Sequence, residues 1–244
     1  MISVCVATYN GAEYIEPQLQ SILSQLAPTD EVIVSDDGSS DGTPARIEAL
    51  HDPRIRVITQ SHVGATQNFY AAMEQAQGEY IFLADQDDVW LPNKVARNIE
   101  LLQGYDLVVC DARVTDAALH EISPSLFRQL GSREGLIKNW LFCTFYGSSM
   151  AFRRSVLEAA KPFPKGQYMA HDWWIGMVAE MTGRVLFLPE PMILYRRHGG
   201  NVTELNNQSV LTRSSRSLRD KIGARLQMAY YMIRYRITRQ FQSL

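Results

Sequence analysis

Short apolar runs alternate with segments of helical spacing over about the first ninety residues of the chain. The apolar runs predict strands at residues 2–10, 31–37, 54–60 and 79–84. The segments between them carry apolar residues every three or four positions and predict helices at 14–27, 39–52 and 65–78. Such alternation is typical of βαβ units. The sequence therefore predicts an α/β fold with a mainly parallel central sheet flanked by helices.

A polar cluster follows three of the four predicted strands. The clusters are TYNG (8–11), DDGSSDGT (36–43) and DQDD (85–88). Taken one at a time, such loops are explained by turns and helix caps alone. However, parallel sheets of this kind bind ligands beyond the carboxyl ends of their strands. The shared position of the clusters therefore favours one functional site at this edge of the sheet.

The stretch YIFLADQDDVW (80–90) places three carboxylates directly after an apolar strand. Asp85, Asp87 and Asp88 repel one another, and burying them is costly unless a positive charge lies near. A solvated loop or a divalent cation would meet that need. The chain has neither a GxxxxGK[ST] nor a GxGxxG motif to hold phosphates. A diphosphate would then be held through a metal, and a carboxylate pair suits Mg²⁺ or Mn²⁺.

The charge is unevenly distributed along the 244 residues. Residues 1–212 hold 16 Lys/Arg and 25 Asp/Glu, a net −9, whereas residues 213–244 hold eight and one, a net +7. An acidic body with a basic tail suggests two separate tasks.

Residues 217–244 predict an amphipathic helix. Its apolar stripe comprises Leu218, Ile222, Leu226, Ala229, Met232 or Ile233, and Ile237. One interpretation is that residues 213–244 bind the anionic inner face of the cell membrane. The other is that the helix packs on its own domain or on a second subunit, which would make a homodimer.

The three cysteines are scattered, which favours reduced thiols and a cytoplasmic location. The start of the chain has no basic and apolar leader pattern, and its longest charge-free apolar stretch, residues 139–152, is too short to span a bilayer. We expect no nucleic-acid partner.

Five motifs occur in a fixed order along the chain: VATYNGAEYI, VSDDGSSDGT, GEYIFLADQDDVWLPNK, HDWW and YRRHGGN. Together they resemble a family 2 glycosyltransferase of the GT-A fold. The last two are similar to bacterial rhamnosyltransferase-like members that build cell-surface polysaccharides such as O-antigen. The resemblance implies a glycosyltransferase domain at 1–203, with a nucleotide-sugar half at about 1–111, an acceptor half at about 112–203, and a helical tail at 204–244.

This resemblance also implies an activity. Such enzymes use a divalent metal, Mn²⁺ or Mg²⁺, and invert the anomeric centre. The donor would be dTDP-rhamnose or a UDP-sugar, and the acceptor would be a hydroxyl of a glycan or of a lipid-linked glycan. Residues implied to bind the nucleotide-sugar are Thr8, Tyr9, Asn10, Glu13, Asp37, Asn68, Asp85 and Arg196.

More specific roles follow from the same resemblance. Asp37 matches the carboxylate that accepts the imide N–H of uracil or thymine, which is chemically apt because a carboxylate only accepts. Asp87 is implied as the direct metal ligand of the DxD element, and His198 as a further ligand. Arg196 and Arg197 are candidates for a diphosphate clamp.

Asp172 matches the general base that removes the proton of the acceptor hydroxyl. Its alternative role is helix capping, because a helix is predicted to start there. His171, Trp173 and Trp174 are implied on the acceptor side. The indoles would stack on sugar faces, and the alternative is that at least one belongs to the core.

Three other functions share parts of this pattern. A sugar-nucleotide nucleotidyltransferase needs a glycine-rich basic loop after the first strand, where ATYNGAEY has no Lys or Arg. A haloacid-dehalogenase-like phosphatase needs a nucleophilic Asp on that strand, which has none. A non-catalytic scaffold of the same fold would need neither the DxD element nor a base.

Overall fold

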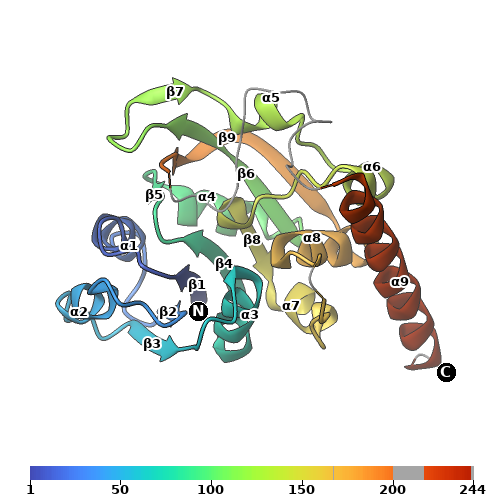
Figure 1. Cartoon of the computed structure of the whole chain (residues 1–244), viewed down its shortest axis with the longest axis horizontal. Coiled ribbons are helices and arrows are strands. Elements are labelled where there is room, and N and C mark those ends of the chain that lie inside the picture. The colour runs from blue at the N-terminus through green and yellow to red at the C-terminus, as the bar shows by residue number, and fades with distance from the viewer. Residues whose placement is uncertain (167, 200–216, 243–244) are drawn as a thin grey trace.

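The computed structural model of the chain describes residues 1–166, 168–199 and 217–242. Its centre is one sheet of nine strands in the order β3-β2-β1-β4-β8-β6-β9-β5, with β7 paired to β6 (Figure 1). The sheet is continuous, so both halves of the chain share one framework.

The N-terminal half follows the predicted βαβ pattern. Strands β1 (Ile2–Thr8), β2 (Glu31–Asp36), β3 (Ile55–Thr59) and β4 (Tyr80–Asp85) pair in parallel. Helices α1 (Ile15–Leu23), α2 (Thr43–Glu48) and α3 (Ala65–Gln75) connect them. The polar clusters after β1, β2 and β4 therefore meet at one edge, as the sequence predicts.

The second half adds antiparallel pairs that the sequence pattern did not predict. Strand β8 (Met150–Arg153) lies antiparallel between β4 and β6 (Leu107–Thr115). Strand β9 (Val185–Arg196) is parallel to β6, whereas β5 (Val89–Trp90) and β7 (Glu121–Ser123) pair in antiparallel fashion with β9 and β6. The sheet is thus parallel at its N-terminal end and mixed beyond β4. The expected division near residue 111 falls inside β6.

The described residues form seven further helical segments. They are α4 (Lys94–Leu101), α5 (Leu126–Leu130), α6 (Leu136–Leu141), the 3₁₀ turn η1 (Gly147–Ser149), α7 (Arg154–Ala160), α8 (His171–Thr182) and α9 (Leu218–Gln242).

Apolar side chains cover both faces of the sheet. Cys5 of β1 joins the core formed with α3, α7 and α8, while its neighbours Val4 and Val6 join the core formed with α1, α2 and α4. Successive strand residues point to opposite faces, so a strand buried on both sides is apolar throughout. This explains why β1, β2 and β4 are predominantly apolar along their length in the sequence.

Helix α9 forms the C-terminal end of the described chain and runs along one side of the domain (Figure 1). Its residues Ala224 and Met228 are buried, and the Trp140 Nε1–H of α6 donates to the Arg225 carbonyl over 2.9 Å. The helix expected at 217–244 is therefore present, with one face packed on its own domain. The first part of the helical tail expected at 204–244, residues 204–216, lies outside the described residues. None of the described helices has the length and apolar character needed to cross a bilayer.

Gly78 gives a test of the packing between α3 and β1. A Cβ at this position would lie 2.6 Å from the Ser3 backbone nitrogen and 2.7 Å from the Ile2 carbonyl carbon. Backbone atoms in a sheet cannot move aside cheaply, so Gly78→Ala should lower the free energy of unfolding by about 1–3 kcal/mol. Urea denaturation measures this. Gly104→Ala is the control, because the nearest atom there is 3.9 Å away; equal loss in both variants would contradict this account.

Candidate functional site

The loops after β1 and β4 are tied together by one side chain, Gln86. Its Oε1 accepts the Thr8 hydroxyl over 2.6 Å and the Tyr9 backbone N–H over 2.8 Å. Its Nε2 donates to the Tyr9 carbonyl over 3.2 Å. The sequence pattern assigns Gln86 no role, because this residue occupies the middle position of the DxD element. In the structure, Gln86 holds two of the three polar clusters in a fixed position relative to each other.

The third cluster joins through Asn10 and Asp36. The Asn10 backbone N–H donates to the Ser39 hydroxyl over 2.8 Å, and Asn10 Oδ1 accepts the Ser40 N–H over 2.9 Å. Asp36 accepts both the backbone N–H and the hydroxyl of Ser39. Asn10 has a φ of 49°, which asparagine tolerates better than most residues. The loops after β1, β2 and β4 therefore form one hydrogen-bonded surface.

Asp37 and Asn68 are buried beneath that surface. Each Asp37 carboxylate oxygen accepts one backbone N–H, from Val63 and from Gly64, both over 2.8 Å. Asn68 Nδ2 donates to the carbonyls of Ser35 and Thr8 and thus joins the ends of β2 and β1. Asn68 is 2% exposed, so it supports the pocket from below. Among the side chains implied at the rim, Tyr9 and Glu13 are exposed.

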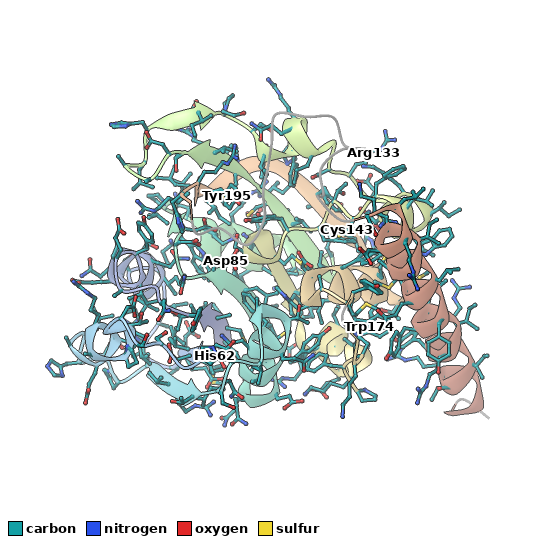
Figure 2. All side chains as sticks on the ribbon, viewed as in Figure 1. His62, Asp85, Arg133, Cys143, Trp174 and Tyr195 are labelled. Atoms are coloured by element: carbon teal, nitrogen blue, oxygen red, sulfur yellow. The ribbon has the colours of Figure 1, made fainter. Side chains whose placement is uncertain are left out.

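The three carboxylates lie where β4 ends, and Figure 2 shows Asp85 near the centre of the molecule. Burial, followed by the charges of Asp87 and Asp172, raises the pKa of Asp85 to about 8. Burial and the charges of Asp87 and Asp85 raise the pKa of Asp88 well above its usual range. Loss of hydration and mutual repulsion both favour the protonated acid.

The end of β9 closes the site over these carboxylates. His198 Nε2 lies 2.8 Å from Asp87 Oδ2. Arg196 donates through Nε to the Asp87 carbonyl over 2.8 Å and through its backbone N–H to Asp88 Oδ1 over 3.1 Å. Its guanidinium also lies over the ring of Tyr14, 4.8 Å from the centroid. The structure brings the DxD loop and the YRRH segment together, as the resemblance implied, and Arg196 holds the loop backbone.

Asp172 belongs to the second half of the chain. It lies in the first turn of α8, and its charge is close enough to contribute to the raised pKa of Asp85. Its Oδ1 accepts the Trp173 backbone N–H over 2.7 Å, so part of the carboxylate serves the helix start. Its Oδ2 makes no hydrogen bond within the described part of the chain.

His171 is held beside Asp172 by aromatic packing. Its ring stacks on Phe69 with centroids 4.0 Å apart. Burial lowers the pKa of His171, and the charge of Asp172 opposes that shift only in part. The imidazole is therefore neutral near pH 7. Gly147 makes room for it, because a Cβ there would lie 2.7 Å from His171 Nε2.

The two tryptophans do not have the position predicted for sugar-stacking residues. Trp173 is 5% exposed and its Nε1–H donates to the Asn139 carbonyl; Trp174 is 3% exposed and its Nε1–H donates to the Ala160 carbonyl. Figure 2 shows Trp174 in the interior next to α9. Neither ring offers a free face, so both belong to the core, and they fix α8 and hence Asp172.

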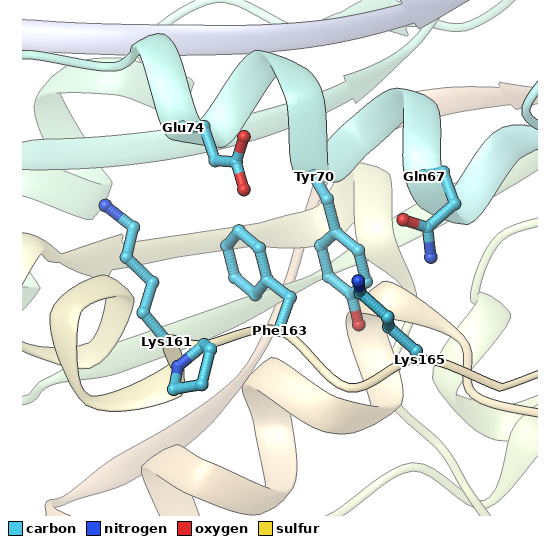
Figure 3. A pocket seen from close by; sticks show the side chains of 7 residues that line it. Gln67, Tyr70, Glu74, Lys161, Phe163 and Lys165 are labelled. Carbon is cyan, nitrogen blue, oxygen red and sulfur yellow. The ribbon is translucent and has the colours of Figure 1, made fainter.

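A hollow of about 510 Å³ lies between α3 and the loop after α7 (Figure 3). Tyr70 and Phe163 stack at its floor with centroids 4.1 Å apart. The Tyr70 hydroxyl is buried and has no hydrogen-bond partner among the described residues. Burial and the Asp172 charge raise the pKa of Tyr70, which places this hydroxyl near the candidate base. Sequence reasoning missed this hollow because its two sides are about ninety residues apart.

A family model described as glycosyl transferase family 2 matches residues 3–160. This match spans more than half of the chain. The chain belongs to glycosyl transferase family 2. The membership confirms the resemblance and places the chain among glycosyltransferases, so the nucleotidyltransferase and phosphatase alternatives fall away.

Curated relatives support the same family. An uncharacterized glycosyltransferase of Nostoc sp. is 31% identical over 221 residues, covering 82% of this chain and 66% of that protein. The putative teichuronic acid biosynthesis glycosyltransferase TuaG of Bacillus subtilis is 33% identical over 49% of this chain and 52% of its own length. An Escherichia coli glucosyltransferase, WfgD, named for transfer from UDP-Glc to a diphosphoundecaprenol-linked GlcNAc, is 31% identical over 42% of this chain and 41% of its own length. The chain thus spans less than two thirds of each.

Solved structures confirm the fold. Staphylococcus aureus TarS, in complex with UDP-GlcNAc, has a TM-score of 0.69 at 20% identity and covers 91% of this chain and 64% of its own. The Pyrobaculum calidifontis mannosyltransferase PcManGT, in complex with GDP-Man and Mn²⁺, has a TM-score of 0.63 at 20% identity, covering 94% of this chain and 69% of its own. The predicted GT-A-like α/β sandwich is therefore correct.

Enzymes of this family and fold generally use a divalent metal, and the residues of this chain fit one. Asp87 and His198 supply an oxygen and a nitrogen that lie 2.8 Å apart. The raised pKa of Asp85 shows that its ionised form is not stabilised by a nearby positive charge, which a cation would provide. No group of three or more His, Cys, Asp or Glu suited to a metal occurs in residues 1–166, 168–199 and 217–242. A family 2 site of this kind would need donor phosphates and water to complete the coordination.

The raised pKa of Asp85 predicts a pH dependence of stability in metal-free buffer. The unfolded chain releases this proton near pH 3.9, whereas the folded protein holds it to about pH 8. Stability should therefore fall as pH rises between these values. Asp85→Asn removes that penalty and should raise the melting temperature at pH 8 by several degrees, but change it little at pH 4.

Differential scanning fluorimetry with a chelator present measures both variants across this pH range. Asp106→Asn, at the start of β6, controls for the loss of one carboxylate. A constant difference between Asp85→Asn and the parent protein at all pH values would contradict the assignment.

Proposed function

We propose that this chain is an inverting glycosyltransferase of cell-surface polysaccharide synthesis, which moves a sugar from a nucleotide-diphosphate sugar to a hydroxyl of a glycan or lipid-linked glycan. The observation that carries the proposal is the contact between the YRRH segment and the DxD loop, in which His198 Nε2 lies 2.8 Å from Asp87 Oδ2. The relatives TuaG and WfgD, named for teichuronic acid and diphosphoundecaprenol-linked acceptors, support the substrate class.

The donor is a dTDP-sugar such as dTDP-rhamnose, or a UDP-sugar. Asp37 lies in the loop after β2, and each of its oxygens accepts only one backbone N–H. A carboxylate has about four lone-pair sites, so Asp37 retains acceptor capacity for the imide N–H of uracil or thymine. The TarS complex with UDP-GlcNAc supports a uracil nucleotide in this fold.

Transfer proceeds in one displacement. The acceptor hydroxyl oxygen forms a bond to C1 of the sugar as the bond from C1 to the diphosphate oxygen breaks, with its electron pair leaving on the diphosphate. Asp172 Oδ2 takes the hydroxyl proton, while Oδ1 remains bonded to the Trp173 N–H and fixes the carboxylate. We place the acceptor in the hollow beside Tyr70.

The donor side neutralises the leaving group. Asp87 and His198 would hold Mn²⁺ or Mg²⁺, which when bound offsets the negative charge on the diphosphate. Arg196 keeps the DxD loop in place through the Asp87 carbonyl and the Asp88 carboxylate. Gln86 keeps the nucleotide loop against it. The chain therefore separates a donor side on β1–β4 from an acceptor side on α8.

Asp87→Asn and Asp172→Asn separate these two sides. Asp87→Asn should abolish metal-dependent binding of UDP- or dTDP-sugars, measured by isothermal titration calorimetry. Asp172→Asn should leave donor binding unchanged but lower transfer on the order of 100-fold or more, because a general base is lost. Near-normal transfer by Asp172→Asn would refute the assigned base. Asp220→Asn, in the first turn of α9, controls for removal of a helix-start carboxylate.

His198→Ala tests the second proposed metal ligand. If His198 is a ligand, the Mn²⁺ concentration that gives half-maximal activity should rise about 10-fold or more. His120→Ala is a matched control, since His120 also pairs with an aspartate, Asp116, over 3.1 Å but is 81% exposed in its side chain. An unchanged Mn²⁺ dependence would return His198 to a structural role.

A further inference from the structure

Helix α9 exposes a continuous apolar stripe. Its members are 50–75% exposed: Leu218, Ile222, Leu226, Tyr230, Ile233 and Ile237. On a helix of about 3.6 residues per turn these positions fall within about one third of the circumference, over a length of roughly 28 Å. So many large apolar side chains on one surface mark an interaction site rather than ordinary exposure.

The opposite side of the helix fixes this orientation. Ala224 and Met228 are buried against the domain. Trp174 of α8 packs edge-on against Tyr231 and Tyr235, with centroids about 6 Å apart. The stripe therefore faces outward because the other face of α9 is packed. A rotation of α9 about its own axis that buried the stripe would expose these aromatic contacts.

The charged side chains around the stripe are basic. Arg219, Arg234, Arg236 and Arg239 are exposed, and none forms an ion pair with another described residue. Arg234 and Arg236 lie at the two edges of the stripe in the helical projection. The single acid of this helix, Asp220, accepts the Tyr168 hydroxyl over 3.0 Å on the packed side. The outward surface thus combines an apolar centre with a positive margin.

We propose that this outward face of α9 docks on an anionic lipid surface. Apolar side chains enter the acyl boundary, and flanking arginines reach the headgroups while their stems stay apolar. A second copy of the chain fits the outward face of α9 less well than an anionic lipid surface does. A symmetric contact uses the same patch on both subunits, so arginine would face arginine with no acid on this face to neutralise it. Anionic headgroups supply that missing charge.

The surface continues beyond the helix onto α6. Arg225 Nη2 donates to the Leu141 carbonyl over 2.7 Å, which seats the end of α6 against α9. Leu141 and its neighbour Phe142 are each 38% exposed. The apolar area at the N-terminal half of α9 is therefore widened by a second segment that the sequence analysis had not assigned to this surface.

Docking would place the acceptor side of the site near lipid. Helix α9 touches α8, which carries Asp172, and the Tyr231 hydroxyl donates to the Lys165 carbonyl in the loop that borders the hollow. Access to a lipid-linked acceptor rests on the proposed function, whereas the docking itself does not.

Vesicle co-sedimentation of the full chain tests the proposal. The vesicles contain phosphatidylcholine alone, or with about one third phosphatidylglycerol. The chain should bind the anionic vesicles at low salt and be released as salt screens the charges. Arg234→Gln/Arg236→Gln should weaken the association constant by about 30-fold, since each basic residue contributes about fivefold. Leu226→Gln/Ile233→Gln should weaken it at least as much.

Matched controls lie on the far side of the molecule. Arg46→Gln/Arg113→Gln removes two guanidiniums of similar exposure, and Ile122→Gln removes an apolar side chain that is 55% exposed; all should bind as the parent does. Absence of binding by the parent protein, or equal binding by every variant, overturns the proposal. So does a dimer in sedimentation equilibrium that Leu226→Gln/Ile233→Gln dissociates. Metal-dependent donor hydrolysis without vesicles reports the proposed function separately and should be unaffected by the α9 variants.

Discussion

The candidate site depends on holding three carboxylates together at the end of β4. Their repulsion is tolerated because the backbone around them is fixed by other groups: Gln18 Nε2 donates to the Asp85 carbonyl over 2.8 Å, and Arg196 donates to the Asp87 carbonyl. The carboxylates also avoid full ionisation. With the pKa of Asp88 far above its usual range and that of Asp85 near 8, the metal-free loop carries less than its formal charge. A cation would reverse this by favouring the ionised form of Asp85.

The antiparallel strand β8 makes this loop part of a two-sided site. It pairs with β4 on one side and with β6 on the other, and therefore joins the parallel N-terminal half to the half that carries α8 and β9. The charge of Asp172 in α8 contributes to the raised pKa of Asp85, and His198, which follows β9, lies 2.8 Å from Asp87. One short strand thus sets the relative position of the residues that we propose for the donor side and the acceptor side.

The sequence predicted the N-terminal half well because β1, β2 and β4 are buried on both faces and the helices between the strands have an amphipathic pattern. It predicted none of β6, β7 and β8. Strand β8 has four residues, three of them within the apolar stretch 139–152, which also contains the end of α6 and a 3₁₀ turn. A period of two cannot be recognised over so short a run. Local pattern also could not show that Trp173 and Trp174 point into the core, because the partners that receive their N–H groups, Asn139 and Ala160, are 34 and 14 residues away.

Motif positions alone also could not separate residues that touch a ligand from residues that hold the pocket. Asn68 and Gln86 occupy equally prominent positions, yet their hydrogen bonds are made to the chain itself. Their contribution is rigidity: the loops after β1, β2 and β4 are joined before any ligand arrives. Groups placed in advance need not reorganise when charge develops in the reaction, and this is where enzymes gain most of their electrostatic stabilisation. The motif residues that bond only to the chain itself therefore still matter for catalysis, because they fix the positions of Asp37, Asp85 and Asp87.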